Sequence, residues 1–403
     1  MKRAIAFVLV LLVFSSALCA QEAKKNLSAE TVASWNAEFA CDLYAKLGAE
    51  PGNVFISPYS VSTALAMTWA GARGDTAEKM GRVLHYPLNP EAVHSAAGVL
   101  MRKLEEVNQT KGCRVAIANR LFGRQGEPFR PEFLDLIDKS YGGGMERMNF
   151  AGDSEGSRKA INAWVEKKTE DRIKDLLVRD DVGRDTKLVL ANAIYFKGDW
   201  ETPFDKNLTA SGVFMVDAAK DRLQPQVPMM KRIGTMPYFK GNGFQAVELP
   251  YVGKSLSMVV FLPDAVDGLA AFEKTLTERN LAAWLPSLRN RESIRLSLPK
   301  FTMTIRYELE KTLADMGLPL TGDFSGMTAG GGLSISKVIH KAFVDVNEEG
   351  TEAAAATAVI MERGMPPPPV EFKADHPFFF LIRDKAMGSI LFMGRVVNPK
   401  EQP

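Results

Sequence analysis

Few side chains in this sequence have the types and spacing that nucleophilic or metal chemistry requires. Ser57 and His340 could supply a nucleophile and a base, but Ser57 does not lie in a Gly-x-Ser-x-Gly motif and no acid accompanies the pair. The other histidines, His85, His94 and His376, lack the spacing of metal ligands. No phosphate-binding glycine loop is present. We therefore expect a protein that is not an enzyme and that uses no metal and no cofactor.

The most informative segment runs from residue 345 to residue 369. Gly350 relaxes the backbone, alanines follow, and four consecutive prolines impose an extended conformation. Alanine favours helix, so a short helix over 352–358 is one interpretation. With a period of two, however, both carboxylates, Glu352 and Glu362, share one face, and the other face carries only uncharged residues: Thr351, Ala353, Ala355, Thr357, Val359 and Met361. This separation suits a strand that slides into a sheet, because burying a charge there is costly.

The elements around this segment indicate an α+β fold. Residues 336–346 form the strand that leads into it, with Val338, His340 and Ala342 on one face. Residues 187–196 are almost continuously apolar, which is typical of a strand buried on both faces. Helical spacing dominates the first half of the chain, as in residues 32–47, and short strands dominate the second half. No linker or repeat divides the chain, so we expect one large domain.

The first twenty residues have the pattern of a secretory signal peptide. Lys2 and Arg3 precede an apolar run that ends at Leu18, and the small Ala20 follows. Removing these two cations from the 50 basic residues leaves 48, equal to the 48 acidic ones. This neutral balance argues against a nucleic-acid partner, and the run is short for a membrane anchor. Cys41 and Cys113 remain, and we interpret them as two separate buried thiols.

The chain resembles the serpin family over residues 28 to 399. The resemblance rests on five motifs, in order and at the family's spacing: Asn53-Val-Phe-Ile-Ser-Pro-Tyr-Ser, Leu190-Ala-Asn-Ala-Ile-Tyr-Phe-Lys-Gly-Asp-Trp, Asn347-Glu-Glu-Gly-Thr-Glu-Ala-Ala-Ala-Ala-Thr-Ala, Ala374-Asp-His-Pro-Phe and Phe392-Met-Gly-Arg-Val-Val-Asn-Pro. It implies a single serpin domain over residues 21–403, in which about nine helices surround three mostly antiparallel sheets. It also implies an exposed reactive-centre loop at about residues 348–369.

The resemblance further implies a suicide inhibitor of serine proteases. The protease cleaves the loop and forms an acyl-enzyme, and the loop then inserts into the central sheet of a metastable fold and carries the protease with it. This mechanism comes with the family. The stretch from Gly350 to Gly364 would span about 50 Å as a strand, which is enough to move the enzyme from one pole toward the other.

The same resemblance assigns roles to individual residues. The hinge where insertion starts comprises Glu348, Gly350, Thr351, Ala353, Ala355 and Thr357. The shutter cluster beneath the central sheet, which governs its opening, comprises Ser57, Ser60, Asn192 and His340. The breach, where the loop enters the sheet, comprises Trp200 and the ion pair of Lys300 with Glu348.

The scissile bond follows from the family's usual interval. Seventeen residues counted from Glu348 end at Gly364, which predicts cleavage between Gly364 and Met365. A shift of one residue would make Arg363 the specificity residue. Gly364 suits an elastase-like or subtilisin-like protease with a small pocket, whereas Arg363 suits a trypsin-like protease. We expect a secreted, extracellular monomer whose partner is such a protease, with no membrane or nucleic-acid partner.

The main alternative is a non-inhibitory serpin that serves as a carrier, a storage protein or a chaperone. Such members tend to carry charged or bulky residues in the hinge. The uncharged face of this hinge has none, which favours the inhibitor.

Overall fold

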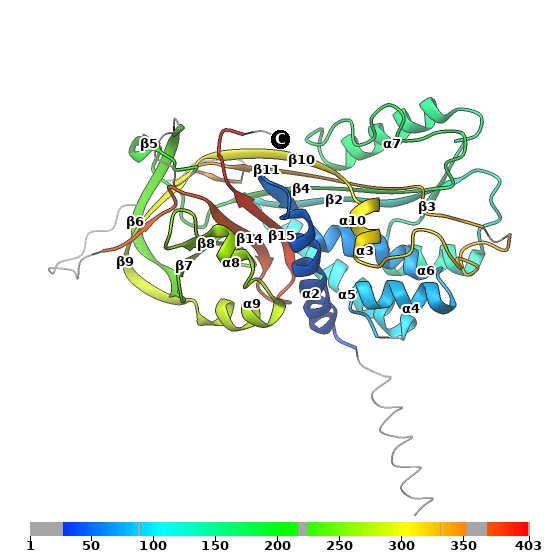
Figure 1. Ribbon diagram of the computed structural model, residues 1–403, viewed down its shortest axis with the longest axis horizontal. Helices are drawn as coiled ribbons and strands as arrows, with labels where there is room; N and C mark the ends of the chain where they lie inside the picture. Colours follow the sequence, from blue (N-terminus) through cyan, green and yellow to red (C-terminus); the bar gives the residue numbers. More distant parts are fainter. Residues whose placement is uncertain (1–26, 88, 217–223, 331, 352–368, 402–403) are drawn as a thin grey trace, which may run out of the picture.

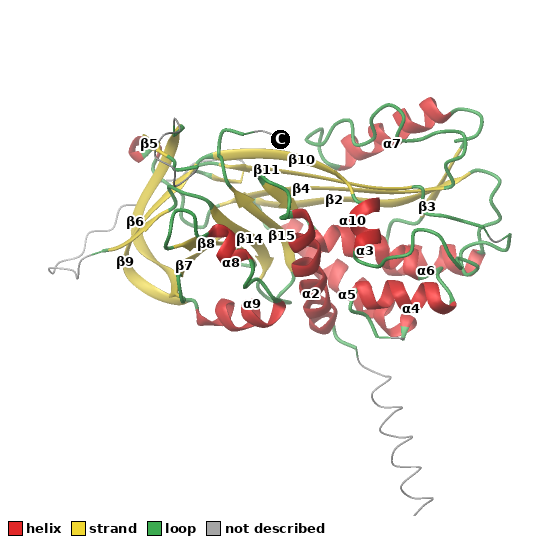
Figure 2. Cartoon of the chain, viewed as in Figure 1, coloured by secondary structure: helices red, strands yellow, loops and turns green. Residues whose placement is uncertain are grey.

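The computed structural model describes residues 27–87, 89–216, 224–330, 332–351 and 369–401. The predicted signal peptide at residues 1–20 lies outside these ranges. Within them, nine α-helices and fifteen strands gather around one long central sheet, as Figures 1 and 2 show. The α+β fold class predicted from the sequence is confirmed.

The helices cluster in the first half of the chain. They are α2 (Ala29–Leu47), α3 (Pro58–Trp69), α4 (Gly74–Val83), α5 (Pro90–Glu106), α6 (Pro131–Tyr141), α7 (Ser154–Lys168), α8 (Leu269–Glu273), α9 (Glu278–Trp284) and α10 (Glu310–Asp315). The helix α2 begins where the Ser28 hydroxyl accepts a hydrogen bond from the Thr31 amide at 3.2 Å. Its predicted apolar face is buried at Val32, Phe39 and Leu43.

The central sheet has six strands. They are β10 (Phe301–Glu308), β11 (Lys337–Val346), β4 (Leu188–Asp199), β2 (Cys113–Arg124) and β3 (Met145–Met148) in spatial order, with the short β12 (Gly350–Thr351) also paired to β4. Helix α7 lies on one face of this sheet and the main helical group, including α3 and α6, lies on the other (Figure 1). Because both faces are covered, β4 is buried on both sides, as its apolar sequence predicts.

A second sheet of nine strands lies beside the helices. In spatial order it contains β1 (Val54–Ile56), β15 (Ile390–Val396), β14 (Phe378–Asp384), β8 (Leu256–Pro263), β7 (Phe244–Pro250), β6 (Gln226–Lys240), β9 (Arg289–Pro299) and β13 (Val370–Lys373), and β5 (Ala210–Val213) also pairs with β6. The three predicted sheets therefore appear as two hydrogen-bonded sheets. The reason is that β6 pairs with β9 over most of its length and with β7 at its end, from Tyr238 to Lys240, so it joins two smaller sheets into one.

Two further expectations concern the cysteines and the membrane. Cys41 and Cys113 are separate free thiols, both buried, as the sequence predicts. Burial raises the pKa of the Cys41 thiol to about 12, so it stays protonated and unreactive at neutral pH. None of the helices in the described part of the chain combines the length and the apolarity needed to span a bilayer.

Candidate functional site

The strands β4 and β11 flank the path along which the loop is expected to insert. They pair in parallel from Lys337 opposite Val189 to Phe343 opposite Tyr195. Beyond that point β11 no longer pairs with β4, and β12 lies beside β4 instead, with Gly350 opposite Asp199 and the backbone of Thr351 opposite Gly198. The hinge residues Gly350 and Thr351 are thus already paired with the strand that a new neighbour must join.

A tight turn at residues 347–350, here called the hinge turn, joins β11 to β12. Every carbonyl in it accepts a hydrogen bond: Asn347 O from the Trp200 indole (3.0 Å), Glu348 O from the Phe204 amide (2.8 Å), Glu349 O from the Trp200 amide (2.8 Å) and Gly350 O from the Asn347 amide (2.9 Å). The Asn347 side chain also accepts from the amides of Glu349 (3.1 Å) and Gly350 (3.3 Å). The turn is therefore held in one conformation by its own side chain and by the segment that follows β4.

The hinge residue Gly350 fits this position because it lacks a side chain. A Cβ added to it would lie 2.5 Å from Asp199 Cα and still closer to the Gly198 carbonyl oxygen, inside the 3.0 Å that real Cβ atoms keep. Its φ of +157° also disfavours other residues. Only glycine therefore lets β12 approach β4 closely enough to pair.

The predicted breach pair forms at the hinge turn. The Lys300 ammonium lies 2.8 Å from one Glu348 carboxylate oxygen, and the Thr209 hydroxyl donates to the other at 2.8 Å. The Glu348 side chain is 7% exposed. Burial by itself disfavours the charged carboxylate, but Lys300, the backbone and Thr209 outweigh it and hold the pKa of Glu348 below its usual value. Glu348 therefore stays ionised and anchors the base of the loop.

Trp200, also predicted at the breach, forms the apolar floor below the hinge turn. Its ring stacks on Tyr251 with centroids 4.6 Å apart, and it meets Phe204 edge-on at 6.4 Å. Only 2% of Trp200 is exposed. Its indole and amide both bond to the hinge turn, so burial of the ring fixes the place of the turn.

The four predicted shutter residues meet beneath the middle of the central sheet, and Asn119 joins them in what we call the polar cluster. The register places Asn119, Asn192 and His340 side by side on β2, β4 and β11. The Asn192 amide group donates to Ser60 Oγ at 2.7 Å and to Asn119 Oδ1 at 2.6 Å. Its carbonyl oxygen bonds to His340 Nδ1. The cluster thus connects three neighbouring strands.

The protonation of His340 follows from its partners. The Ser57 amide donates to His340 Nε2 at 3.0 Å, so Nε2 carries no proton and Nδ1 donates to Asn192. His340 is fully buried, and burial lowers its pKa to about 3, so the ring is neutral at physiological pH. Ser57 itself is the N-cap of α3, accepts from the Ser60 amide at 3.2 Å and donates to Leu391 O at 2.6 Å.

This arrangement gives the polar cluster two halves. His340 on β11 is bound by Ser57, whereas Asn192 on β4 is bound by Ser60 and Asn119. If β4 and β11 separate, the bond between His340 and Asn192 is the one that breaks within the cluster. The first turn of α3 lies across this seam because it supplies both serines.

Some predicted site residues cannot be compared with the structure. The hinge residues Ala353, Ala355 and Thr357 and the candidate scissile residues Arg363, Gly364 and Met365 lie outside the described residues. They remain predictions.

Sequence reasoning missed several residues that the structure brings into the site. Asn119 could have been found as a polar residue inside the apolar strand run of residues 113–122. Thr209 bonds to Glu348 and Lys206 bonds to Glu349. No sequence pattern marks either residue, because both lie in an exposed polar segment far from the hinge in sequence.

The rest of the molecule offers no catalytic constellation among its described residues. The sequence Gly152-Asp-Ser-Glu-Gly156 matches the nucleophile pattern, and Ser154 begins α7 after a strand and a turn. It has no base, however, because all four histidines bond elsewhere: His85 to Asp42, His94 to Tyr141, His340 within the polar cluster and His376 to Asp375 and Pro263. No group of three or more potential metal ligands occurs in the described part of the chain.

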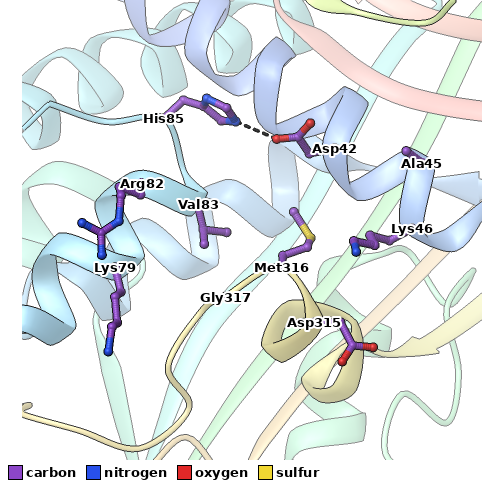
Figure 3. A pocket seen from close by; sticks show the side chains of 10 residues that line it. All are labelled: Asp42, Ala45, Lys46, Lys79, Arg82, Val83, His85, Asp315, Met316 and Gly317. Atoms are coloured by element: carbon purple, nitrogen blue, oxygen red, sulfur yellow. Dashed lines mark hydrogen bonds and ion pairs between the residues drawn. The ribbon is translucent and has the colours of Figure 1, made fainter. Parts of the chain in front are cut away.

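A surface pocket of about 630 Å³ lies between α2, α4 and the end of α10 (Figure 3). In it, His85 faces the carboxylate of Asp42 at 2.8 Å, and its other nitrogen lies 3.0 Å from Glu38. Among the described residues that line this pocket there is no serine, threonine or cysteine to act as a nucleophile.

Comparison with known proteins gives a consistent result. The family described as serpin (serine protease inhibitor) matches residues 34–399. Leukocyte elastase inhibitor from Bos taurus is 41% identical over 383 residues, which cover 92% of this chain and 100% of that protein. An uncharacterized serpin-like protein from Thermococcus kodakarensis is 40% identical, covering 90% of this chain and 84% of its own. The solved structure of Arabidopsis AtSerpin1 in its native stressed conformation aligns with a TM-score of 0.81 at 27% identity, covering 93% of this chain and all of that one.

Proposed function

Because this chain belongs to the serpin family, we propose that it is a suicide inhibitor of serine proteases. A target protease cleaves the loop that follows Gly350 and remains attached as an acyl-enzyme. The loop then enters the central sheet as a new strand between β4 and β11, and the displaced protease cannot complete hydrolysis. The inhibitor itself is not an enzyme, in keeping with relatives that are named as protease inhibitors.

The observation that carries this proposal is that the strand paired with β4 changes from β11 to β12 along its length. Its first half pairs with β11, while its last residues pair with β12 at the start of the loop. Extending β12 along β4 requires the pairs from Val189 to Tyr195 to separate from β11. The polar cluster lies on that seam, so it supports a role for Asn192 and His340 in sheet opening.

The energetics also favour insertion after cleavage. In the intact chain the segment that follows Thr351 is tied at both ends, by β12 on one side and by β13, which starts at Val370, on the other. Cutting the loop frees one end, and the new strand then gains a backbone hydrogen-bond ladder on both sides. We therefore expect cleavage to stabilise the molecule.

We further propose the protease class and the compartment. Cleavage between Gly364 and Met365 would suit an elastase-like or subtilisin-like enzyme, and the name of the bovine leukocyte elastase inhibitor is consistent with the former. Cleavage after Arg363 would suit a trypsin-like enzyme. The pattern of residues 1–20 supports export of the chain, which N-terminal sequencing of the mature protein from its source would test.

The decisive experiment mixes the purified protein with elastase, subtilisin and trypsin in separate reactions. An inhibitor forms a complex with at least one of them that survives boiling in detergent, and the mass of the released carboxy-terminal fragment identifies the scissile bond. In parallel, loop cleavage by a non-target protease should raise the melting temperature sharply. A protein that is merely cut by all three enzymes, with no rise in melting temperature, is a non-inhibitory serpin and contradicts the proposal.

A further inference from the structure

The second carboxylate of the hinge turn has its own cationic partner. Glu349 follows Glu348 directly, and its side chain forms an ion pair of its own with Lys206 of the short helix η2 (Lys206–Leu208). The Glu349 side chain is 10% exposed and that of Lys206 is 62% exposed. Lys206 and Thr209, from one segment, therefore hold one carboxylate each, and Lys300 of a second segment adds to the hold on Glu348.

These anchors act on the residue at which strand pairing begins. Glu348 is held by Lys300 and Thr209, Glu349 is held by Lys206, and the next residue, Gly350, pairs with Asp199. Strand side chains alternate between the two faces of a sheet, so a shift of one residue in this pairing exchanges the faces of everything that follows. By the sequence alternation, such a shift would turn the face with Glu352 and Glu362 toward the interior.

The charges around Gly350 make the Lys206 pair more than a surface contact. Asp199 faces Gly350 across the ladder, and its Oδ1 is buried with no hydrogen-bond donor among the described residues. Burial raises the pKa of Asp199, Lys197 lowers it and Glu349 raises it further, so Glu349 and Asp199 repel each other. Without Lys206, a nearly buried Glu349 would lose its cation beside a second carboxylate, and the hinge turn would gain by moving Glu349 into water.

From this geometry we propose that Lys206 is a positioning residue for loop insertion, which holds Glu349 so that the cleaved loop enters the sheet in the register that keeps its charged face outward. The inference rests on the proposed inhibitory function. If the register slips or entry is delayed, more acyl-enzyme is hydrolysed before trapping, so Lys206 controls the ratio of cleaved inhibitor to trapped protease.

The test measures this ratio together with the association rate constant, using the protease that forms a stable complex with the wild type. We expect Lys206→Met and Glu349→Gln each to raise the ratio by about threefold or more, since one partner of the pair is almost buried. The double variant should do no worse than either single variant, because both remove the same contact. Association rates should stay within about twofold of wild type, because recognition of the loop precedes insertion, and Lys206→Arg should restore the low ratio.

The matched control is Lys254→Met, which removes the cation of the exposed pair with Glu201 at 3.2 Å, a pair that includes no residue of the hinge turn. It should leave the ratio unchanged. Unchanged ratios in both single variants, or effects of Lys206→Met and Glu349→Gln that multiply in the double variant, would overturn the inference. Absence of any stable complex with the wild type would instead reject the proposed function, so the two failures are distinguishable.

Discussion

Replacing Gly350 by alanine is the most direct test of how the loop begins its entry. The added Cβ would lie 2.5 Å from Asp199 Cα and still closer to the Gly198 carbonyl oxygen, so the two backbones must move apart by more than about 0.5 Å to reach the 3.0 Å limit. Neither neighbour is a flexible side chain that can turn aside, since both are backbone atoms of β4. The substitution should therefore expel β12 from its place beside β4.

The size of the effect follows from the cost of overpacking. Forcing an extra methyl group into a packed site costs about 1–3 kcal/mol. If this cost is added to the barrier for loop insertion, insertion slows by about 5-fold to 150-fold, because about 1.4 kcal/mol corresponds to a factor of ten. Hydrolysis of the acyl-enzyme is unaffected, so the ratio of cleaved inhibitor to trapped protease should rise by the same factor.

The assay titrates a fixed amount of protease with wild type and Gly350→Ala and measures residual activity and cleaved inhibitor. Gly234→Ala provides a control, since Gly234 also lies in a strand but an added Cβ would meet nothing within 4 Å. Gly234→Ala should behave as wild type. An unchanged ratio in Gly350→Ala, with the protein folded, would refute the argument that close approach at this residue permits insertion.

Two other predictions concern the hinge and the polar cluster. Thr351→Arg should convert the inhibitor into a substrate, because it puts a charge on the face that must become buried. A gel that resolves detergent-resistant complexes with the protease checks this, and an undiminished amount of complex would contradict the mechanism. His340 has a pKa of about 3 in the folded protein and about 6.5 in the unfolded chain, so between these pH values only the unfolded chain takes up the proton. Its contribution to the free energy of unfolding is therefore complete above pH 6.5 and falls as the pH drops toward 3, by at most about 1.4 kcal/mol per pH unit. Denaturant unfolding of wild type and His340→Gln over this range should give curves that converge at low pH, and parallel curves would show that His340 is not the group responsible.

Much of the fold could be predicted from local pattern. The apolar run of β4 and the alternation of β11 have the periods that their burial requires, and both strands form where the sequence indicates them. The sheet count was less accessible, because it depends on β6 pairing with both β9 and β7, which are distant in sequence from each other.

The candidate site was predicted in part. Ser57, Ser60, Asn192 and His340 do meet, as do Lys300 and Glu348. Asn119, Thr209 and Lys206 were missed, although each bonds directly to a residue of the site. Their side chains reach the site only because distant segments pack together, and sequence spacing carries no record of that packing.

Residue order alone identifies the segment that we propose to insert as a strand, because freedom from charge on one face follows directly from that order. The position at which the proposed strand would start follows from contacts that form in the folded chain. The starting point depends on the pairing of Gly350 with Asp199, on the turn held by Trp200 and on the cations that reach Glu348 and Glu349. These contacts join residues some 50 to 150 positions apart, and short-range electrostatic and hydrogen-bonding forces act between such residues only after the chain has folded.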